Sequence, residues 1–564
     1  MFETFKTVTM AQMATFDDVL EVTGRIGWFQ IRSFIFLLIT HLIGSWVVFA
    51  LVFIGGTNDH WCTVGQLEQE DCMELNMTSS DCDQLKRDLT TSGLSEGDAK
   101  CMKYNISGND VVSALAQLED VTKPDVIPCD DGWTYDRSMY GITVTEEWNL
   151  VCDYSTIPNI LMSTFFGGIL LGCLVFGYLA DRIGRYRVFC ICIIGAALCS
   201  LLSALSPHVL VFGSLRFMLG FFMYGSALVT FVIATELVLP DKRVYLGTGV
   251  WYCFALGQVL LPGLAILIPN WRHLIIVTTM PFLLLVPAFW FLTESPRWLV
   301  ADENFEEAEK VIQEIAKVNK KEIPHNLLTK LREEYVKAQA DEQTTFRNLI
   351  RNPVLMVYFI CLLYIWFAQS FVYYGLSLGT SSLGMNIHAA FSISGAVELP
   401  AYAFSMFTMN KFGRRLSTGG LTFVAGLACL GTILIPVGPF RVTVAMVGKF
   451  AITASFANIY LHTSEIFPTP LRTSVTGICS VAARVGGMVA PLILVLGQYW
   501  VSLPLVCFGV SAILAAFLMF MLPETKGRSM PDTIGDSVKL RRVPVRNEDN
   551  SVGGAVTTTN TITS

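Results

Sequence analysis

Long apolar runs separated by short polar loops dominate this chain of 564 residues. A bilayer core of roughly 30 Å requires about 20 apolar residues per helix. By that criterion we expect twelve membrane-spanning helices, near 32–54, 159–181, 187–205, 209–235, 247–268, 273–293, 355–377, 390–410, 416–436, 440–462, 475–497 and 502–522. The pattern therefore predicts an all-α membrane protein.

Two long polar insertions interrupt the apolar runs. The first, 55–153, should form a folded outer domain. The second, about 296–350, contains apolar residues at the spacing of one helix face, which predicts a small helical layer at the inner surface. These residues are Phe305, Ala308, Val311, Ile312, Ile315 and Val318.

Composition and charge support a membrane protein and give its orientation. Only 15% of the residues are charged, against roughly 25% in soluble domains. Lysine and arginine gather in the loops after the second, fourth, eighth and tenth predicted spans, and cytoplasmic loops carry such an excess. Both termini should therefore be cytoplasmic. Residues 1–24 lack a basic segment and a cleavage site, so we expect no removable signal peptide.

The first insertion has the features of an extracellular domain. An even set of cysteines in one polar loop indicates disulfides formed in an oxidising compartment, and six cysteines leave 15 pairings open. The six are Cys62, Cys72, Cys82, Cys101, Cys129 and Cys152. Two glycosylation sequons, at Asn76 and Asn105, lie in the same loop.

The two halves of the chain repeat each other. Gly184 and Gly413 follow similar loops at an offset of 229 residues (413 − 184), and the pairs Glu236/Glu465 and Arg243/Arg472 have the same offset. Basic, glycine-rich inner loops would explain the similar composition but not the shared offset. Parallel six-span halves of this kind place a substrate site between them at the bilayer midplane.

Several motifs resemble a known family. The string GYLADRIGR (177–185) and its echo TMNKFGRR (408–415) look like the signature loops of the major facilitator superfamily. The strings FDDVLEVTGRIGWFQ (16–30), TESPRWL (293–299) and LPETKG (522–527), with the six-cysteine loop, resemble the organic cation, anion and carnitine transporter family. The resemblance implies the major facilitator fold and polyspecific transport of small organic ions at the plasma membrane.

Two charged residues inside predicted spans are candidates for substrate contact, because such charges are costly in a bilayer. Arg484 should lie near mid-depth and offer a positive charge to a carboxylate. Glu398 should lie at similar depth as a counter-charge for an ammonium group or as a proton or cation site. A structural arginine, or an internal Arg484–Glu398 pair, is the alternative.

Aromatic residues are expected in the same layer, where a ring face attracts ammonium groups. They are Tyr224, Trp251, Tyr252, Trp366, Tyr373 and Tyr374, with Gln369 as a polar candidate; ordinary packing is the alternative for each aromatic. The resemblance adds that cation transporters carry an aspartate where this chain has Arg484 and a lysine where it has Tyr224. Residues 373–402 are more similar to the carnitine branch.

Charged residues at the inner ends of the spans form a candidate gate whose ion pairs would join the halves when the cavity opens outward. The alternative is that these residues only orient the protein in the membrane, as basic inner loops do. That alternative explains the lysines and arginines but not the acidic residues at the same ends. The candidates are Asp181, Arg182, Arg185, Glu236, Arg243, Lys411, Arg414, Glu465 and Arg472.

These observations predict a secondary transporter of organic cations or zwitterions of the carnitine type, with an organic anion transporter or exchanger as the alternative. A receptor using the outer domain is the non-transporter alternative. We expect no enzyme activity and no cofactor, metal, nucleotide or nucleic acid as a partner. The expected partners are the organic ion and the bilayer, and a coupling ion is possible. The predicted divisions are 1–31 (cytoplasmic), 32–293 (first half, including loop 55–153), 294–352 (intracellular helical linker), 353–522 (second half) and 523–564 (cytoplasmic tail).

Overall fold

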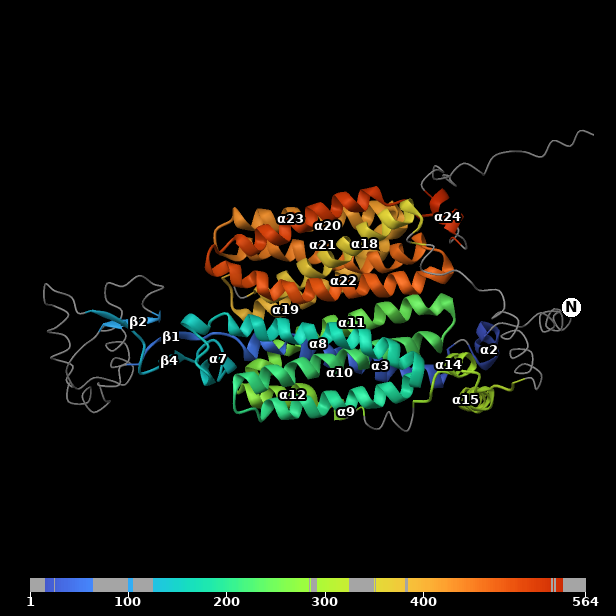
Figure 1. The fold of residues 1–564 in the computed structure, drawn as a ribbon, viewed down its shortest axis with the longest axis horizontal. Coiled ribbons are helices and arrows are strands. Elements are labelled where there is room, and N and C mark those ends of the chain that lie inside the picture. The colour runs from blue at the N-terminus through green and yellow to red at the C-terminus, as the bar shows by residue number, and fades with distance from the viewer. Residues whose placement is uncertain are drawn as a thin grey trace, which may run out of the picture.

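The computed structural model describes residues 16–24, 26–63, 100–104, 125–283, 285, 292–323, 349, 351–380, 384–528, 531 and 534–540. Its main body is a bundle of long helices that run side by side (Figure 1). The first half contains α3 (Trp28–Ile54), α8 (Ile157–Ile183), α9 (Arg185–Ala204), α10 (Val209–Glu236), α11 (Pro240–Leu267) and α12 (Trp271–Leu283). The second contains α18 (Pro353–Leu378), α19 (Ile387–Phe412), α20 (Arg414–Ile433), α21 (Pro439–Ile466), α22 (Thr469–Val495) and α23 (Leu503–Met521).

Local sequence explains where many of these helices begin. Prolines occupy the first turn of α8, α11, α18, α21, α22 and α23, where a missing N–H costs nothing. The side chain of Asn352 accepts hydrogen bonds from Val354 N and Leu355 N at the start of α18. Asn386 caps α19 in the same way.

Ten helices in the described part of the chain are long and apolar enough to cross a membrane. The two remaining predicted spans, 273–293 and 390–410, correspond to α12 and α19, which are not among these ten helices. The described part of α12 has only 13 residues, and polar side chains such as Ser394, Glu398 and Ser405 interrupt the apolar surface of α19. The all-helical membrane fold is therefore established, and the count of twelve spans stays a prediction.

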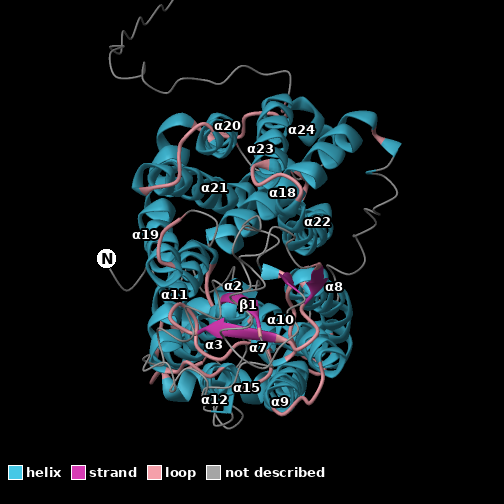
Figure 2. Cartoon of the chain, turned by 90° about the vertical axis from the view of Figure 1, so that its left-hand side faces the viewer, coloured by secondary structure: helices cyan, strands magenta, loops and turns pink. Residues whose placement is uncertain are grey.

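The halves lie against each other along two pairs of helices. Figure 2 looks along the bundle and shows the first-half helices below and the second-half helices above. Helix α8 packs on α22, and α11 packs on α19, at the border between the halves. One continuous apolar core includes buried side chains from both halves, such as Phe165 and Trp366.

Short strands extend from one end of the bundle, which we call the outer end (Figure 1). Strand β1 (Asp59–Cys62) pairs with β4 (Trp133–Asp136), and β2 (Met102–Tyr104) pairs with β3 (Val126–Pro128), both antiparallel. Helix α7 (Val144–Glu147) and the 3-10 turn η2 (Cys152–Tyr154) lead back to the bundle. Disulfides join Cys62 to Cys129 and Cys101 to Cys152. Cys72, Cys82, Asn76 and Asn105 lie outside the described residues.

Small helices cover the opposite, inner end: α2 (Phe16–Thr23), α14 (Pro296–Ala301), α15 (Phe305–Val318) and, beside α18, α24 (Ile534–Lys539). The predicted amphipathic helix is confirmed, since Ala308, Val311, Ile312 and Ile315 of α15 are buried. Asn319 connects this layer to the bundle: its side chain donates to Thr23 O at 3.0 Å and accepts from Phe29 N at 3.1 Å.

Candidate functional site

Arg484 lies in the middle of α22 and is 9% exposed. Its guanidinium donates a hydrogen bond to the hydroxyl of Tyr224 on α10 and lies 4.4 Å from the centre of that ring. Tyr374 and Tyr460 are close enough to interact with it electrostatically. Because α10 and α22 belong to different halves, the Arg484–Tyr224 contact joins the halves within the bundle.

No acidic side chain in the described part of the chain forms an ion pair with Arg484, and its Nε atom has no hydrogen-bond partner there. A charged side chain at the centre of a membrane helix costs roughly 2.5–3.5 kcal/mol on insertion scales. A phenol and ring faces compensate that charge only in part, because they carry no full negative charge. Arg484 is thus a buried cation without an anionic partner among the described residues.

Glu398, on α19, is completely buried and has three partners of its own. Its carboxylate lies 2.8 Å from Lys449 Nζ and accepts hydrogen bonds from the hydroxyls of Tyr373 at 2.8 Å and Tyr402 at 3.1 Å. The predicted alternative of an internal pair with Arg484 is therefore wrong. The partner is a lysine on α21, a helix that packs directly against α19 in the same half.

Lys449 lies outside the set of site residues that the sequence predicts. It is 1% exposed, donates to the hydroxyl of Ser377, and lies 3.4 Å from the centre of the Tyr373 ring. Arg216, on α10, is a second buried cation that was missed; it donates to Val47 O at 3.2 Å and lies 4.7 Å from the Phe165 ring centre. The signal was present, because both lie inside predicted spans, where charge is costly.

Aromatic side chains connect the two charged groups across the border between the halves. Trp251 and Tyr252 of α11 lie 6.4 and 5.7 Å, centre to centre, from Tyr402, which holds Glu398. Trp251 also lies 6.1 Å from Tyr460. On the other side, Tyr374 lies 4.6 Å from Phe166 of α8. The structure thus brings most of the predicted aromatic residues into one layer.

Two predicted binding residues instead have partners inside the second half. The side-chain amide of Gln369 donates to Thr422 Oγ1 at 2.8 Å and Ser455 Oγ at 2.7 Å, which links α18, α20 and α21. The indole of Trp366 donates to Thr463 at 3.0 Å and packs on Tyr460 at 4.3 Å between ring centres. These two hydrogen bonds of Gln369 are made within the second half, and its buried Oε1 atom has no hydrogen-bond partner among the described groups.

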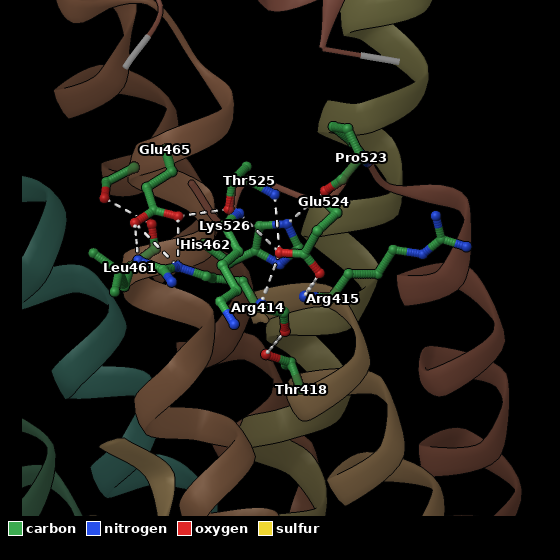
Figure 3. Close-up of polar contacts among 11 residues, drawn as sticks. Arg414, Arg415, Thr418, Leu461, His462, Glu465, Pro523, Glu524, Thr525 and Lys526 are labelled. Carbon is green, nitrogen blue, oxygen red and sulfur yellow. Dashed lines mark hydrogen bonds and ion pairs between the residues drawn. The ribbon is translucent and has the colours of Figure 1, made fainter. Parts of the chain in front are cut away.

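The charged residues at the inner end form the same cluster twice. In the first half Arg185 lies 3.1 Å from Asp181 and 3.4 Å from Glu236. In the second half Arg414 lies 3.0 Å from Glu465 (Figure 3). In each half the arginine and the glutamate are 51 residues apart, so the sequence repeat is also a repeat of contacts.

A second carboxylate completes each cluster. Glu294 accepts from the backbone N–H groups of Arg185 and Tyr186 at 2.9 and 3.1 Å, at the start of α9. Glu524 accepts from Arg414 and Arg415 at 2.8 and 3.0 Å, at the start of α20 (Figure 3). Negative charge is favoured at a helix N-terminus. Burial raises the pKa of Glu294; at Glu524 burial acts in the same direction, but the backbone N–H donors outweigh it and lower the pKa.

The remaining predicted gate residues have other neighbours. Arg182 lies over the Tyr178 ring and Lys411 over the rings of Phe407 and Phe412. Arg472 has two buried guanidinium nitrogens without a partner among the described groups, and the side chain of Arg243 lies outside them. The ion pairs of Arg185, Arg272, Arg414 and Lys449 each lie within one half, so a gate between the halves stays a prediction.

At the outer end, by contrast, the halves touch. His388 of α19 stacks on Phe53 of α3 with ring centres 5.3 Å apart, and its Nε2 atom lies 3.2 Å from Met139 O. Gln498 donates to Ser155 Oγ at 3.1 Å. A cleft of about 370 Å³ beside His388 is lined mainly by the first half. The halves are therefore in contact at the outer end.

Comparison with known proteins agrees with this architecture. The family model described as "Sugar (and other) transporter" matches residues 137–533. A Drosophila melanogaster protein named organic cation transporter protein is 34% identical over 96% of this chain and 97% of its own length. Human solute carrier family 22 member 13 is 34% identical over 93% of each chain. The chain belongs to this transporter family.

Membership of the family makes the protein a multi-pass membrane transporter and not an enzyme. Among solved structures, the inward-open xylose transporter XylE from E. coli covers 89% of this chain and 98% of its own, with a TM-score of 0.58. At 16% identity that likeness concerns the fold alone. It supports the major facilitator architecture for the two halves of this transporter.

Proposed function

We propose that this transporter carries small organic ions that bear a carboxylate, first of all zwitterions of the carnitine type, across the plasma membrane by alternating access. The observation that carries the proposal is the buried Arg484, whose described partners are neutral. A substrate carboxylate would supply the full negative charge that these partners lack. Charge-assisted hydrogen bonds of this kind are about twice as strong as neutral ones.

The ammonium end of a zwitterion would lie on the aromatic faces between the halves. Trp251, Tyr252 and Tyr402 come from both halves and meet beside Glu398. Ring faces bind quaternary ammonium groups through cation–π attraction. The organic cation transporter named among the relatives supports a charged organic substrate for this chain as well.

The Arg484–Tyr224 contact offers a link between binding and movement. A carboxylate at Arg484 would replace the Tyr224 hydroxyl and so remove a bond between α10 and α22. The halves could then change their relative position, as alternating access requires.

We further propose twelve spans, the divisions given from the sequence, cytoplasmic termini, an extracellular cysteine-rich loop with glycans at Asn76 and Asn105, and a gate between the inner ends.

An uptake panel tests the substrate class. Cells expressing the parent protein should take up labelled carnitine and benzoate saturably, and tetraethylammonium poorly. Arg484→Gln should lose carnitine and benzoate uptake at unchanged surface expression, and Arg484→Lys should retain part of both. Saturable tetraethylammonium uptake, with no uptake of either carboxylate, would refute the proposal.

An organic anion transporter or exchanger is the second candidate, and the uncompensated charge of Arg484 favours it as well. It predicts benzoate uptake without carnitine uptake. Preloading the cells with unlabelled benzoate should then accelerate uptake of labelled benzoate if the protein is an exchanger. Carnitine uptake that depends on Arg484 would exclude this candidate.

A further inference from the structure

We propose that the cleft at the outer end of the bundle is a second binding site, which takes apolar organic anions of the aromatic sulfonate type and holds the two halves together when it is occupied. Its volume of about 370 Å³ lies in the range of small-molecule sites. Neither Arg484 nor Glu398 lines this cleft. The site is therefore separate from the layer in which the substrate is proposed to bind.

Both halves contribute to the wall of the cleft. The first half supplies most of it, from the outer ends of α3 and α11, the start of α12 and the segment 137–143. The second half supplies Asn386 and His388 at the start of α19. The backbone of the segment 137–143 is attached to the bundle, because Ile142 O accepts a hydrogen bond from Trp271 N at 3.1 Å. The cleft is thus bounded by connected elements on both sides.

The polar groups of the wall favour an anion. Arg137 donates from Nε to Glu146 at 2.9 Å and from Nη2 to the same oxygen, and the guanidinium has further N–H donors for a ligand. Asn386 Oδ1 accepts from the backbone N–H groups of His388 and Ala389, which leaves its amide NH2 group as a donor. The positive end of the α19 helix dipole lies at the same place. Among the described residues that line the cleft, none is acidic.

The rest of the wall is apolar and suits an aromatic body. The apolar side chains that line it include Phe53, Ile54, Ile266, Ile268 and Leu274. Ile266 is 61% exposed and Met139 is 53% exposed, so a ligand in the cleft would remove apolar surface from water. An aromatic sulfonate combines such a body with one anionic group.

Occupancy of the cleft would stabilise the contact between the halves. His388 of the second half stacks on Phe53 of the first, and its Nε2 atom lies 3.2 Å from Met139 O; all three residues line the cleft. A ligand that contacts α19 and the first-half wall binds this arrangement better than one in which α19 has moved away. Such a ligand shifts the equilibrium towards the state in which the outer ends touch. It should therefore inhibit uptake without competing with the substrate.

Protection of a cysteine in the cleft measures occupancy directly on purified transporter. The probe is naphthalenesulfonate, and Met139→Cys is the reporter, whose reaction with an impermeant maleimide is followed by mass spectrometry of its peptide. We expect saturating probe to slow this reaction severalfold. Tyr499→Cys is the matched control, because Tyr499 is 85% exposed and does not line the cleft. Its reaction rate should not change.

Opposite charges at one exposed position test the preference for an anion. In the reporter chain, Ile266→Glu should raise the probe concentration for half-protection about fivefold, and Ile266→Lys should lower it by a similar factor, since one exposed charge contributes up to about 1 kcal/mol. General damage to the site would shift both variants in the same direction. Equal shifts in the two variants, or absence of protection in the reporter chain itself, would overturn the proposal.

A second pair of variants separates anion binding from the Arg137–Glu146 ion pair. Arg137→Gln and Glu146→Gln both break this pair, but only the first removes the positive charge from the cleft. Arg137→Gln should weaken protection, and Glu146→Gln should preserve or strengthen it. Equal weakening in both would overturn the proposal.

Uptake of labelled carnitine tests the consequence of binding. External naphthalenesulfonate should lower the maximal rate without raising KM, whereas purely competitive inhibition would place the probe in the central layer and overturn the proposal. Cysteine protection requires no transport. Failure of the parent to take up carboxylates would therefore count against the proposed function alone.

Discussion

Removal of one hydroxyl at Tyr224 should strengthen the binding of carboxylate substrates. In the structure this hydroxyl accepts a hydrogen bond from Arg484, and the ring beneath provides a cation–π contact at 4.4 Å. Tyr224→Phe removes the competing acceptor and keeps the ring. The substrate then no longer has to displace a protein group from the guanidinium.

The size of the effect follows from the bond that is lost. A hydrogen bond to a charged group contributes about 1.5–3 kcal/mol, and every 1.4 kcal/mol is a factor of ten in affinity. Part of the gain is lost because water can solvate the freed guanidinium. We therefore expect the Kd for carnitine or benzoate to fall about tenfold in Tyr224→Phe.

Equilibrium binding of labelled substrate to purified transporter measures this Kd directly. Tyr364→Phe is the matched control, because the Tyr364 hydroxyl bonds Ser511 at 3.3 Å between α18 and α23, within the second half. It should leave the Kd unchanged. A Kd that rises or stays constant in Tyr224→Phe would refute the idea that Tyr224 and the substrate compete for Arg484.

Two further predictions concern the ends of the bundle. Gly413→Ala should lower the apparent melting temperature of the purified transporter, because φ is 90° and ψ 171° at this residue and a Cβ atom would meet the Glu524 carboxylate. A non-glycine residue in this backbone conformation costs of order 1–3 kcal/mol. Gly420→Ala, with open space around it, is the control, and equal melting temperatures of the two variants would contradict the expectation. His388→Ala should open the outer end more often, since loss of the Phe53 stack removes about 0.5–1.5 kcal/mol of attraction between the halves. A cysteine introduced as Ile54→Cys, in the cleft, should then react severalfold faster with an impermeant maleimide. An unchanged reaction rate would show that the His388–Phe53 contact does not hold the outer end together.

Much of the fold could be predicted because hydrophobic length and helix periodicity are local properties. The expected span at 209–235 corresponds to α10 (Val209–Glu236), and the buried face of α15 follows its apolar spacing. The pairing of cysteines was open in the sequence, because spacing carries no information about which parts of a folded loop meet. The structure joins Cys62 to Cys129 and Cys101 to Cys152.

The partners within the site could not be predicted in the same way. Glu398 and Arg484 were expected to share a depth, but the partner of a buried charge depends on which helices are neighbours. Helix α21 lies against α19 and delivers Lys449 to Glu398, whereas Arg484 on α22 faces Tyr224 of the other half. Lys449 lies within the predicted span 440–462, but the sequence alone does not place it beside Glu398.

The selectivity of Arg484→Asp tests the central claim most directly, because it reverses the charge that is left uncompensated in the layer. Uptake of carnitine, benzoate and tetraethylammonium is compared in parent and variant at matched surface expression. We predict that the variant loses carnitine and benzoate uptake and retains or gains tetraethylammonium uptake. A variant that transports all three compounds as the parent does would contradict the assignment of Arg484 to the substrate carboxylate.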